Sequence, residues 1–180
     1  MKTILYRLSG KHTTQDGFTL IELLVVIIVL GILSAIALPS FLSQASKAKQ
    51  SEGRTYVGSM NRAQQAYYLE NSRFANDMDL LGTGLQTQTA NYDYSIVSDS
   101  PNLAYVLNAA KPRLETIKGY YGPTKIGPNS SSAIATLTTL CEAKAVGTAP
   151  FTAAPTYNNF GLGAGVNSVP KCANDFKGLN

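Results

Sequence analysis

The pattern of apolar and polar positions separates one long apolar run from a mixed remainder. Residues 18–38 form an apolar run of 21 positions in which the only charged residue is Glu22. At about 1.5 Å per residue, a helix of this length spans roughly 31 Å, which is close to the hydrocarbon thickness of a bilayer. The pattern therefore predicts a membrane-spanning helix over these residues.

Beyond Pro39 the pattern becomes amphipathic, because apolar or small side chains recur at mostly three- and four-residue spacing while charged residues lie between them. We predict that the helix continues to about Asn71 and packs this stripe on a folded head, although Glu52 interrupts the series. Pro39 removes one backbone donor and clashes with the carbonyl four residues earlier, so a helix kink is expected there. The stripe consists of Phe41, Ala45, Ala48, Tyr56, Met60, Ala63 and Tyr67.

The remaining residues show the shorter alternation and the turn residues that are typical of strands. We predict an α+β fold, in which a long N-terminal α-helix, transmembrane and then amphipathic, packs on a small antiparallel β-sheet head of three to five strands. The head is expected to end in a disulfide-bounded loop. The predicted elements are a helical turn at 77–81, strands at 92–97, 103–108, 120–121 and 133–140, and turns at 99–102 and 127–132.

The residues before the apolar run carry three basic side chains against one acidic side chain. The positive-inside rule therefore places them in the cytoplasm and the residues after the run outside. Ordinary secretory signals have their charged region first, the apolar core second and the cleavage site last. Here Gly17 precedes the apolar core, so cleavage after Gly17 would leave the apolar helix on the mature chain.

Glu22 is a functional candidate, because a carboxylate near the centre of a membrane helix costs about 2.5–3.5 kcal/mol, and less towards an end. Cleavage after Gly17 would give Phe18 a free amine four residues from Glu22. This amine could pair with Glu22 of its own or of a neighbouring subunit, which would turn two uncompensated charges into one pair. The alternative is a lone glutamate near a membrane face, ionised and solvated by headgroups.

Composition adds an argument against catalysis and a mild argument for self-association. The only histidine, His12, lies in the predicted leader, and no phosphate-binding loop, nucleophile elbow or metal-ligand cluster appears in the sequence. We therefore predict no enzyme activity and no cofactor. The whole chain carries a net charge of +4, and only 14% of its residues are charged while ten are tyrosines. A surface of low charge suits subunits that pack against copies of themselves.

The ten residues GFTLIELLVV at positions 17–26 resemble the class III signal of type IV prepilins, and Pro39 falls where that family has a helix-kinking proline. The resemblance implies that a prepilin peptidase cuts between Gly17 and Phe18 and methylates the new amine of Phe18. It also implies that Glu22 guides the subunit from the inner membrane into an extracellular filament, with the help of an assembly platform and its ATPases. Minor pilins and type II secretion pseudopilins share the motif.

The resemblance implies four regions. They are a leader at 1–17, a transmembrane and filament-core helix at 18–38, an amphipathic continuation at 39–72, and a globular β head at 73–180. The head is similar to the pilin-like G/H group in the short sequences LLGTG at 80–84, YDY at 92–94, GYYG at 119–122 and CEA at 141–143. We expect a structural subunit of a type IV pilus that serves motility, adhesion or DNA uptake.

Cys141 and Cys172 both lie in the part predicted to be outside the cytoplasm, and no third thiol competes with them. An oxidising compartment favours their pairing. The loop they would close has 32 residues, for which chain entropy suggests a stabilisation of about 3.7 kcal/mol. This region is similar to the disulfide-bounded C-terminal region of pilins. A two-cysteine metal site is the alternative, but it lacks histidine and a short Cys-x-x-Cys pair.

Two ligand hypotheses remain at this point. Basic residues interleaved with Tyr120 and Tyr121 could hold a DNA strand, as in a DNA-receptor pilin, since such patches bind single strands by charge and stacking. Asp77 and Asp79, with Asn76, loosely resemble a loop that supplies oxygen ligands to a cation, and a plain polar loop is the alternative. The basic residues of the DNA hypothesis are Lys111, Arg113, Lys118 and Lys125.

Overall fold

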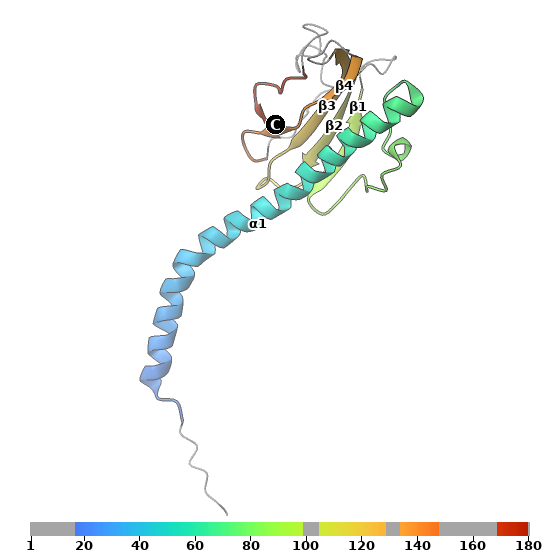
Figure 1. Ribbon diagram of the computed structural model, residues 1–180. Helices are drawn as coiled ribbons and strands as arrows, with labels where there is room; N and C mark the ends of the chain where they lie inside the picture. Colours follow the sequence, from blue (N-terminus) through green and yellow to red (C-terminus); the bar gives the residue numbers. More distant parts are fainter. Residues whose placement is uncertain (1–16, 99–104, 129–133, 148–168, 180) are drawn as a thin grey trace, which may run out of the picture. The chain divides into compact units, whose positions relative to one another are not determined.

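The structure is a computed structural model that describes residues 17–98, 105–128, 134–147 and 169–179 (Figure 1). The chain divides into two compact units, Met1–Leu42 and Ser43–Asn180. The first unit contains the apolar part of helix α1. The second unit contains the rest of α1 and the sheet.

Helix α1 runs from Leu20 to Asn71 without interruption and contains Pro39. It ends where Ser72 adopts a positive φ of 54°, a left-handed conformation that often terminates helices. The amide of Ser72 still donates to the carbonyl of Tyr68 at 2.8 Å. The prediction of a single helix from the apolar run to about Asn71 is confirmed, and the predicted helical turn is the 3₁₀ helix η1, Asp79–Leu81.

The head contains one antiparallel sheet with the strand order β1-β2-β3-β5-β6, and β4 pairs with β3 as well. β3 is the longest strand, and two successive strands share one of its edges. β4 pairs with its second half, whereas β5 pairs with Tyr120 and Tyr121 at its start. The strands are β1 (Tyr92–Val97), β2 (Tyr105–Pro112), β3 (Tyr120–Pro128), β4 (Ile134–Thr138), β5 (Cys141–Ala143) and β6 (Phe176–Gly178).

The strand predictions were correct at β1 and incomplete elsewhere. The sheet has six strands instead of three to five. Gly127 and Pro128 belong to β3, although their residue types favoured a turn. β6 was not predicted, because its three residues are too few to show an alternating pattern. The predicted turn at 99–102 and residues 103–104 of the second predicted strand lie outside the described residues.

The second half of α1 lies across one face of the sheet, and the core of the head is between them (Figure 1). The buried residues of α1 are Gly53, Val57, Met60, Asn61 and Gln64. The predicted stripe was therefore partly wrong. Met60 is buried and Tyr56 packs against the core, but Phe41 and Ala48 are exposed.

The buried helix face is displaced from the predicted stripe because two sheet side chains need space on it. The ring of Tyr92 lies against Gly53, where an added Cβ would meet the ring carbon Cζ at 2.8 Å. Amide side chains also cross the interface, since Asn108 Nδ2 donates to Asn61 Oδ1 at 2.8 Å. Gln64 exchanges two hydrogen bonds of 2.9 Å with the backbone of Ala75. These buried polar groups are satisfied and fix the register of the helix on the sheet.

Candidate functional site

The predicted processing and assembly residues lie at the start of α1. Thr19 and Glu22 form a reciprocal capping arrangement, in which the Glu22 amide donates to Thr19 Oγ1 at 3.3 Å. Glu22 Oε2 in turn accepts hydrogen bonds from the Thr19 amide at 2.9 Å and from its hydroxyl at 2.7 Å. This is the geometry of a capping box, which satisfies amides that have no partner inside the helix. Glu22 therefore has a local structural role that the sequence analysis missed, although Thr-x-x-Glu is its signature.

Apolar side chains cover the described part of the first unit and are in contact with water in the isolated chain. Every residue from Gly17 to Leu42 is exposed, and Phe18 retains 83% of its accessible surface. Monomeric soluble proteins rarely expose apolar patches of more than a few hundred Å². Among the described residues, α1 is the one helix that is long and apolar enough to cross a membrane. This surface needs lipid or other protein around it.

Pro39 lies inside α1, within the exposed part of the helix. The missing donor and the ring clash weaken the helix locally. The kink at Pro39 stays a prediction.

Cys141 and Cys172 form a disulfide, with their Cα atoms 5.7 Å apart. The bond joins β5 to the segment that leads into β6, and it lies in a small core with Tyr121 and Phe176. The hydroxyl of Tyr121 also accepts a hydrogen bond of 2.6 Å from the Ala173 amide. The predicted pairing is confirmed, and it holds the C-terminal segment on the edge of the sheet.

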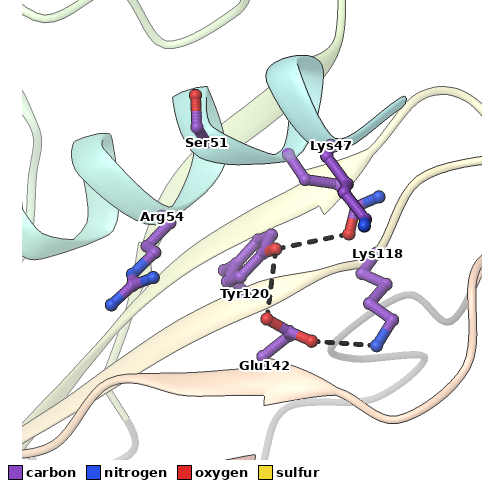
Figure 2. A pocket seen from close by; sticks show the side chains of 7 residues that line it. Lys47, Ser51, Arg54, Lys118, Tyr120 and Glu142 are labelled. Atoms are coloured by element: carbon purple, nitrogen blue, oxygen red, sulfur yellow. Dashed lines mark hydrogen bonds and ion pairs between the residues drawn. The ribbon is translucent and has the colours of Figure 1, made fainter. Parts of the chain in front are cut away.

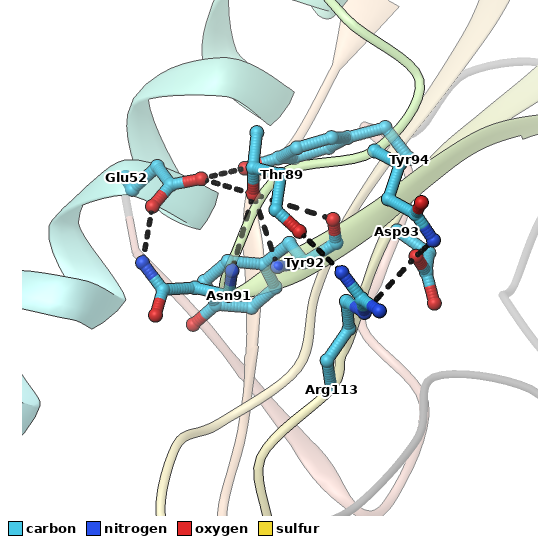
Figure 3. Close-up of polar contacts among 8 residues, drawn as sticks. Glu52, Thr89, Asn91, Tyr92, Asp93, Tyr94 and Arg113 are labelled. Carbon is cyan, nitrogen blue, oxygen red and sulfur yellow. Dashed lines mark hydrogen bonds and ion pairs between the residues drawn. The ribbon is translucent and has the colours of Figure 1, made fainter.

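A polar cluster around Glu52 joins α1 to β1 and to the loop before it (Figure 3). Glu52 Oε1 accepts hydrogen bonds from Thr89 Oγ1 at 2.5 Å and from the Tyr94 hydroxyl at 3.2 Å. Its other oxygen accepts from Asn91 Nδ2 at 2.6 Å. Burial favours a higher pKa for this carboxyl, but the three hydrogen bonds outweigh burial, and the pKa is lowered. The signal in the sequence was the acidic residue that interrupts the apolar stripe.

A second polar feature is a groove between α1 and the start of β3 (Figure 2). Lys118 Nζ donates to Glu142 Oε1 at 2.8 Å, and Lys177 Nζ lies 3.3 Å from the same oxygen. Burial alone would raise the pKa of Glu142, but these two lysines lower it. Burial, and next the charge of Glu142, raises the pKa of Tyr120 to about 12.

The prediction that Tyr120 and Tyr121 form part of a DNA-binding surface is wrong. Tyr120 and Tyr121 are 3% and 0% exposed, so neither ring can stack on a base. Tyr121 packs edge-on against Phe176 with ring centroids 4.7 Å apart. Two of the basic residues are also unavailable to a DNA strand. Lys125 is buried in β3, and burial lowers its pKa. Arg113 Nε lies 3.7 Å from Asp93 Oδ1 and forms an ion pair with it.

The predicted cation loop is organised by its own backbone. Asp77 Oδ1 accepts a hydrogen bond of 3.0 Å from the Asp79 amide at the start of η1. Within the described ranges, no group of three or more metal-ligating side chains comes together. The polar-loop alternative accounts for these contacts.

Two known family models match this chain, one over its N-terminal helix and one over most of its head. The family model of type IV pilin-like G and H proteins matches residues 50–172, which include most of the head. The prokaryotic N-terminal methylation motif matches residues 13–38. The chain belongs to the type IV pilin family. Its helix, its antiparallel sheet and its Cys141–Cys172 disulfide agree with the pilin fold.

Individual pilins are similar to this one over part of their length. The type IV major pilin protein PilA of Myxococcus xanthus is 37% identical over 76 residues, which are 42% of this chain and 34% of that protein. The type IV wide pilus major component PilA4 of Thermus thermophilus is 37% identical over 87 residues, which are 48% of this chain and 66% of that protein. The fimbrial protein EcpC of Eikenella corrodens is 33% identical over 110 residues, 61% and 71% of the two chains. The alignments thus span about one third to somewhat over two thirds of these relatives.

Proposed function

We propose that this pilin is a structural subunit of a type IV pilus and has no enzymatic activity of its own. In this proposal the apolar part of α1 first anchors the chain in the inner membrane, with the head outside the cytoplasm. The same surface then forms the core of an extracellular filament. The observation that carries the proposal is the complete exposure of the apolar helix surface at 17–42, in a chain whose head has its own buried core. Relatives whose names describe major pilins and fimbrial proteins support it.

The processing step we propose is cleavage between Gly17 and Phe18 by a prepilin peptidase, followed by methylation of the Phe18 amine. The match to the N-terminal methylation motif supports this step. Both residues are exposed ahead of the first turn of α1, so the bond between them is open to an enzyme. The mature chain would then start at Phe18, directly before the capping residues Thr19 and Glu22.

In the mature chain we assign Glu22 the role of a charge partner during assembly. Cleavage creates a positive amine close to a carboxylate in an apolar setting, where an isolated charge is unfavourable and a pair is tolerated. The capping contacts with Thr19 hold the carboxylate at the first turn of α1, close to this amine. An assembly platform with its ATPases would supply the work of moving the subunit out of the membrane.

The experiment that tests this proposal is intact mass measurement and N-terminal sequencing of the protein in sheared surface filaments and in membranes. A chain that starts at methylated Phe18 and is abundant in sheared filaments is the expected result, and it would also favour the major-pilin role. The processed chain found only in membranes would assign it instead to the minor pilins or the pseudopilins. An uncut chain in both fractions would refute the proposal.

A matched pair of variants sharpens the processing test. Gly17→Phe should block cleavage and leave the leader on the chain, because a bulky side chain occupies the cleavage position. Gly17→Ala adds a single methyl group, and no neighbouring atom lies within 4 Å of that position in the structure. We expect it to be processed. Equal processing of both variants would contradict the assignment of the cleavage site.

A further inference from the structure

The groove of Figure 2 carries positive charge that the head itself does not neutralise. It has a volume of about 360 Å³ and lies entirely within the second unit. Lys118 and Lys177 both pair with Glu142 on the sheet side. On the helix side, Lys47 and Arg54 form no ion pair with any described residue. The residues that line the groove are Lys47, Gln50, Ser51, Arg54, Lys118, Tyr120 and Glu142.

The two helix cations are arranged to receive one extended acidic surface. Lys47 and Arg54 are seven residues apart, which is close to two helical turns, so they lie on the same face of α1. Figure 2 shows both on the helix that borders the groove, opposite Glu142 of β5 and Lys118, which lies just before β3. A partner carboxylate entering from solvent would find cations on both sides.

The complementary charge is at the other end of the head. Glu70, Asp77 and Asp79 are all exposed at the end of α1 and in the segment that follows it. Arg73 is the one basic residue between positions 70 and 79, so this segment carries a net charge of 3 − 1 = 2 negative charges. The helix wall of the groove carries the matching two positive charges.

These two surfaces cannot meet within one head. Sixteen residues separate Arg54 from Glu70 and 23 separate Lys47 from Glu70, which correspond to about 24 and 35 Å along a helix. A second head displaced along α1 by about this distance would place its groove on the acidic segment of the first. Such a contact joins two different surfaces, and a contact of this type can repeat from copy to copy along an open helical filament.

We propose that the groove between α1 and β3 is a self-association site, which binds the acidic residues 70–79 of a second copy of this chain. The inference rests on the proposed function and adds to it a residue-level contact between heads. Ion pairs at the rim of an interface mainly determine which surfaces meet and in what register. The apolar helices would supply the larger part of the association.

A charge-reversal experiment in the full-length protein tests the contact. One variant changes the groove by Lys47→Glu and Arg54→Glu, and the other changes the acidic segment by Glu70→Lys and Asp79→Lys. Asp77 is left intact because it holds the Asp79 amide. The measurement is the fraction of processed subunit recovered in sheared filaments. Each variant should lose about tenfold or more, since like charges then face each other, and the combined variant should recover to within about threefold of wild type.

Lys49→Glu is the control, because it reverses an exposed charge on α1 that does not line the groove. Near-UV circular dichroism of the tyrosines would establish that each variant head is folded. Normal assembly of either reversed variant overturns the inference. Failure of the combined variant to recover overturns it as well. In that case, binding of inorganic phosphate or an oligonucleotide to the groove of the wild-type protein would show that the groove has a different ligand. If wild type itself yields no sheared filaments, the proposed function fails, which is a separate outcome.

Discussion

Replacing Glu52 tests whether the junction between α1 and the loop before β1 stabilises the head. Three side chains donate hydrogen bonds to this carboxylate, at 2.5, 2.6 and 3.2 Å. A hydrogen bond to a charged group contributes about 1.5–3 kcal/mol. Contributions that share one carboxylate do not add fully, and this site is only half-buried. We therefore expect Glu52→Ala to lower the free energy of unfolding by about 2–4 kcal/mol.

Glu52→Gln separates shape from charge. Its amide oxygen can still accept a hydrogen bond from Asn91 Nδ2, and its amide nitrogen can donate to the hydroxyls of Thr89 and Tyr94, but the hydrogen bonds to a charged acceptor are lost. The expected loss is about 1–2 kcal/mol, smaller than that of the alanine variant. An equal loss in both variants would mean that the negative charge of Glu52, and not the shape of its side chain, carries the contribution.

The effect of Glu52 must also depend on pH. Its pKa in the folded head is lowered, so the ionised carboxylate stabilises the fold above the pKa of the unfolded chain, about 4.3. This contribution disappears as the pH falls through the lower pKa of the folded state. The difference in stability between wild type and Glu52→Gln should therefore be constant near neutral pH and shrink below about pH 4.

The assay is denaturant unfolding of the full-length protein in detergent, followed by the near-UV circular dichroism of its ten tyrosines. Glu70→Gln is the matched control, because Glu70 is an exposed residue of the same helix. It should change the unfolding free energy by less than about 0.5 kcal/mol. A change of similar size in Glu52→Ala, or a difference that does not vary with pH, would refute the reasoning.

Three further predictions follow from single contacts. Gly53→Ala should destabilise the head by about 1–2 kcal/mol in the same assay, because its methyl group would meet the ring of Tyr92. The control Gly58→Ala has open space around it and should be neutral or stabilising by up to about 1 kcal/mol. Removing the disulfide by Cys141→Ala with Cys172→Ala should lower the unfolding free energy by about 2–4 kcal/mol, and wild type in reductant should behave likewise; no change in either would contradict a stabilising role. Glu22→Ala should give few sheared filaments, because it removes the charge that we assign to assembly. Glu22→Gln also removes the charge but keeps an oxygen for the capping bonds, so its filaments should be equally scarce. Normal filaments from Glu22→Gln but not from Glu22→Ala would assign capping as the role of Glu22.

The features that the sequence predicted correctly depend on local order along the chain. An apolar run of 21 residues is recognisable by its length alone, and the N-terminal methylation motif matched at residues 13–38 overlaps it. The strand 92–97 alternates between buried and less buried residues over its first half, and its boundaries were predicted correctly. The pairing of Cys141 with Cys172 followed from the absence of any third cysteine. Each of these inferences used neighbouring residues or a simple count.

The features that the sequence did not predict depend on contacts between distant segments. Glu52 lies in an amphipathic helix as an apparent interruption, and only the fold brings Thr89, Asn91 and Tyr94 to it from 37 or more residues away. Tyr120 was interpreted as part of a nucleic-acid surface, yet the sheet buries its ring under α1. The sequence by itself determined the anchor, the helix and the class of protein. Tertiary structure decided which polar residues stabilise the head and which charges remain unpaired, because those properties depend on packing across the chain.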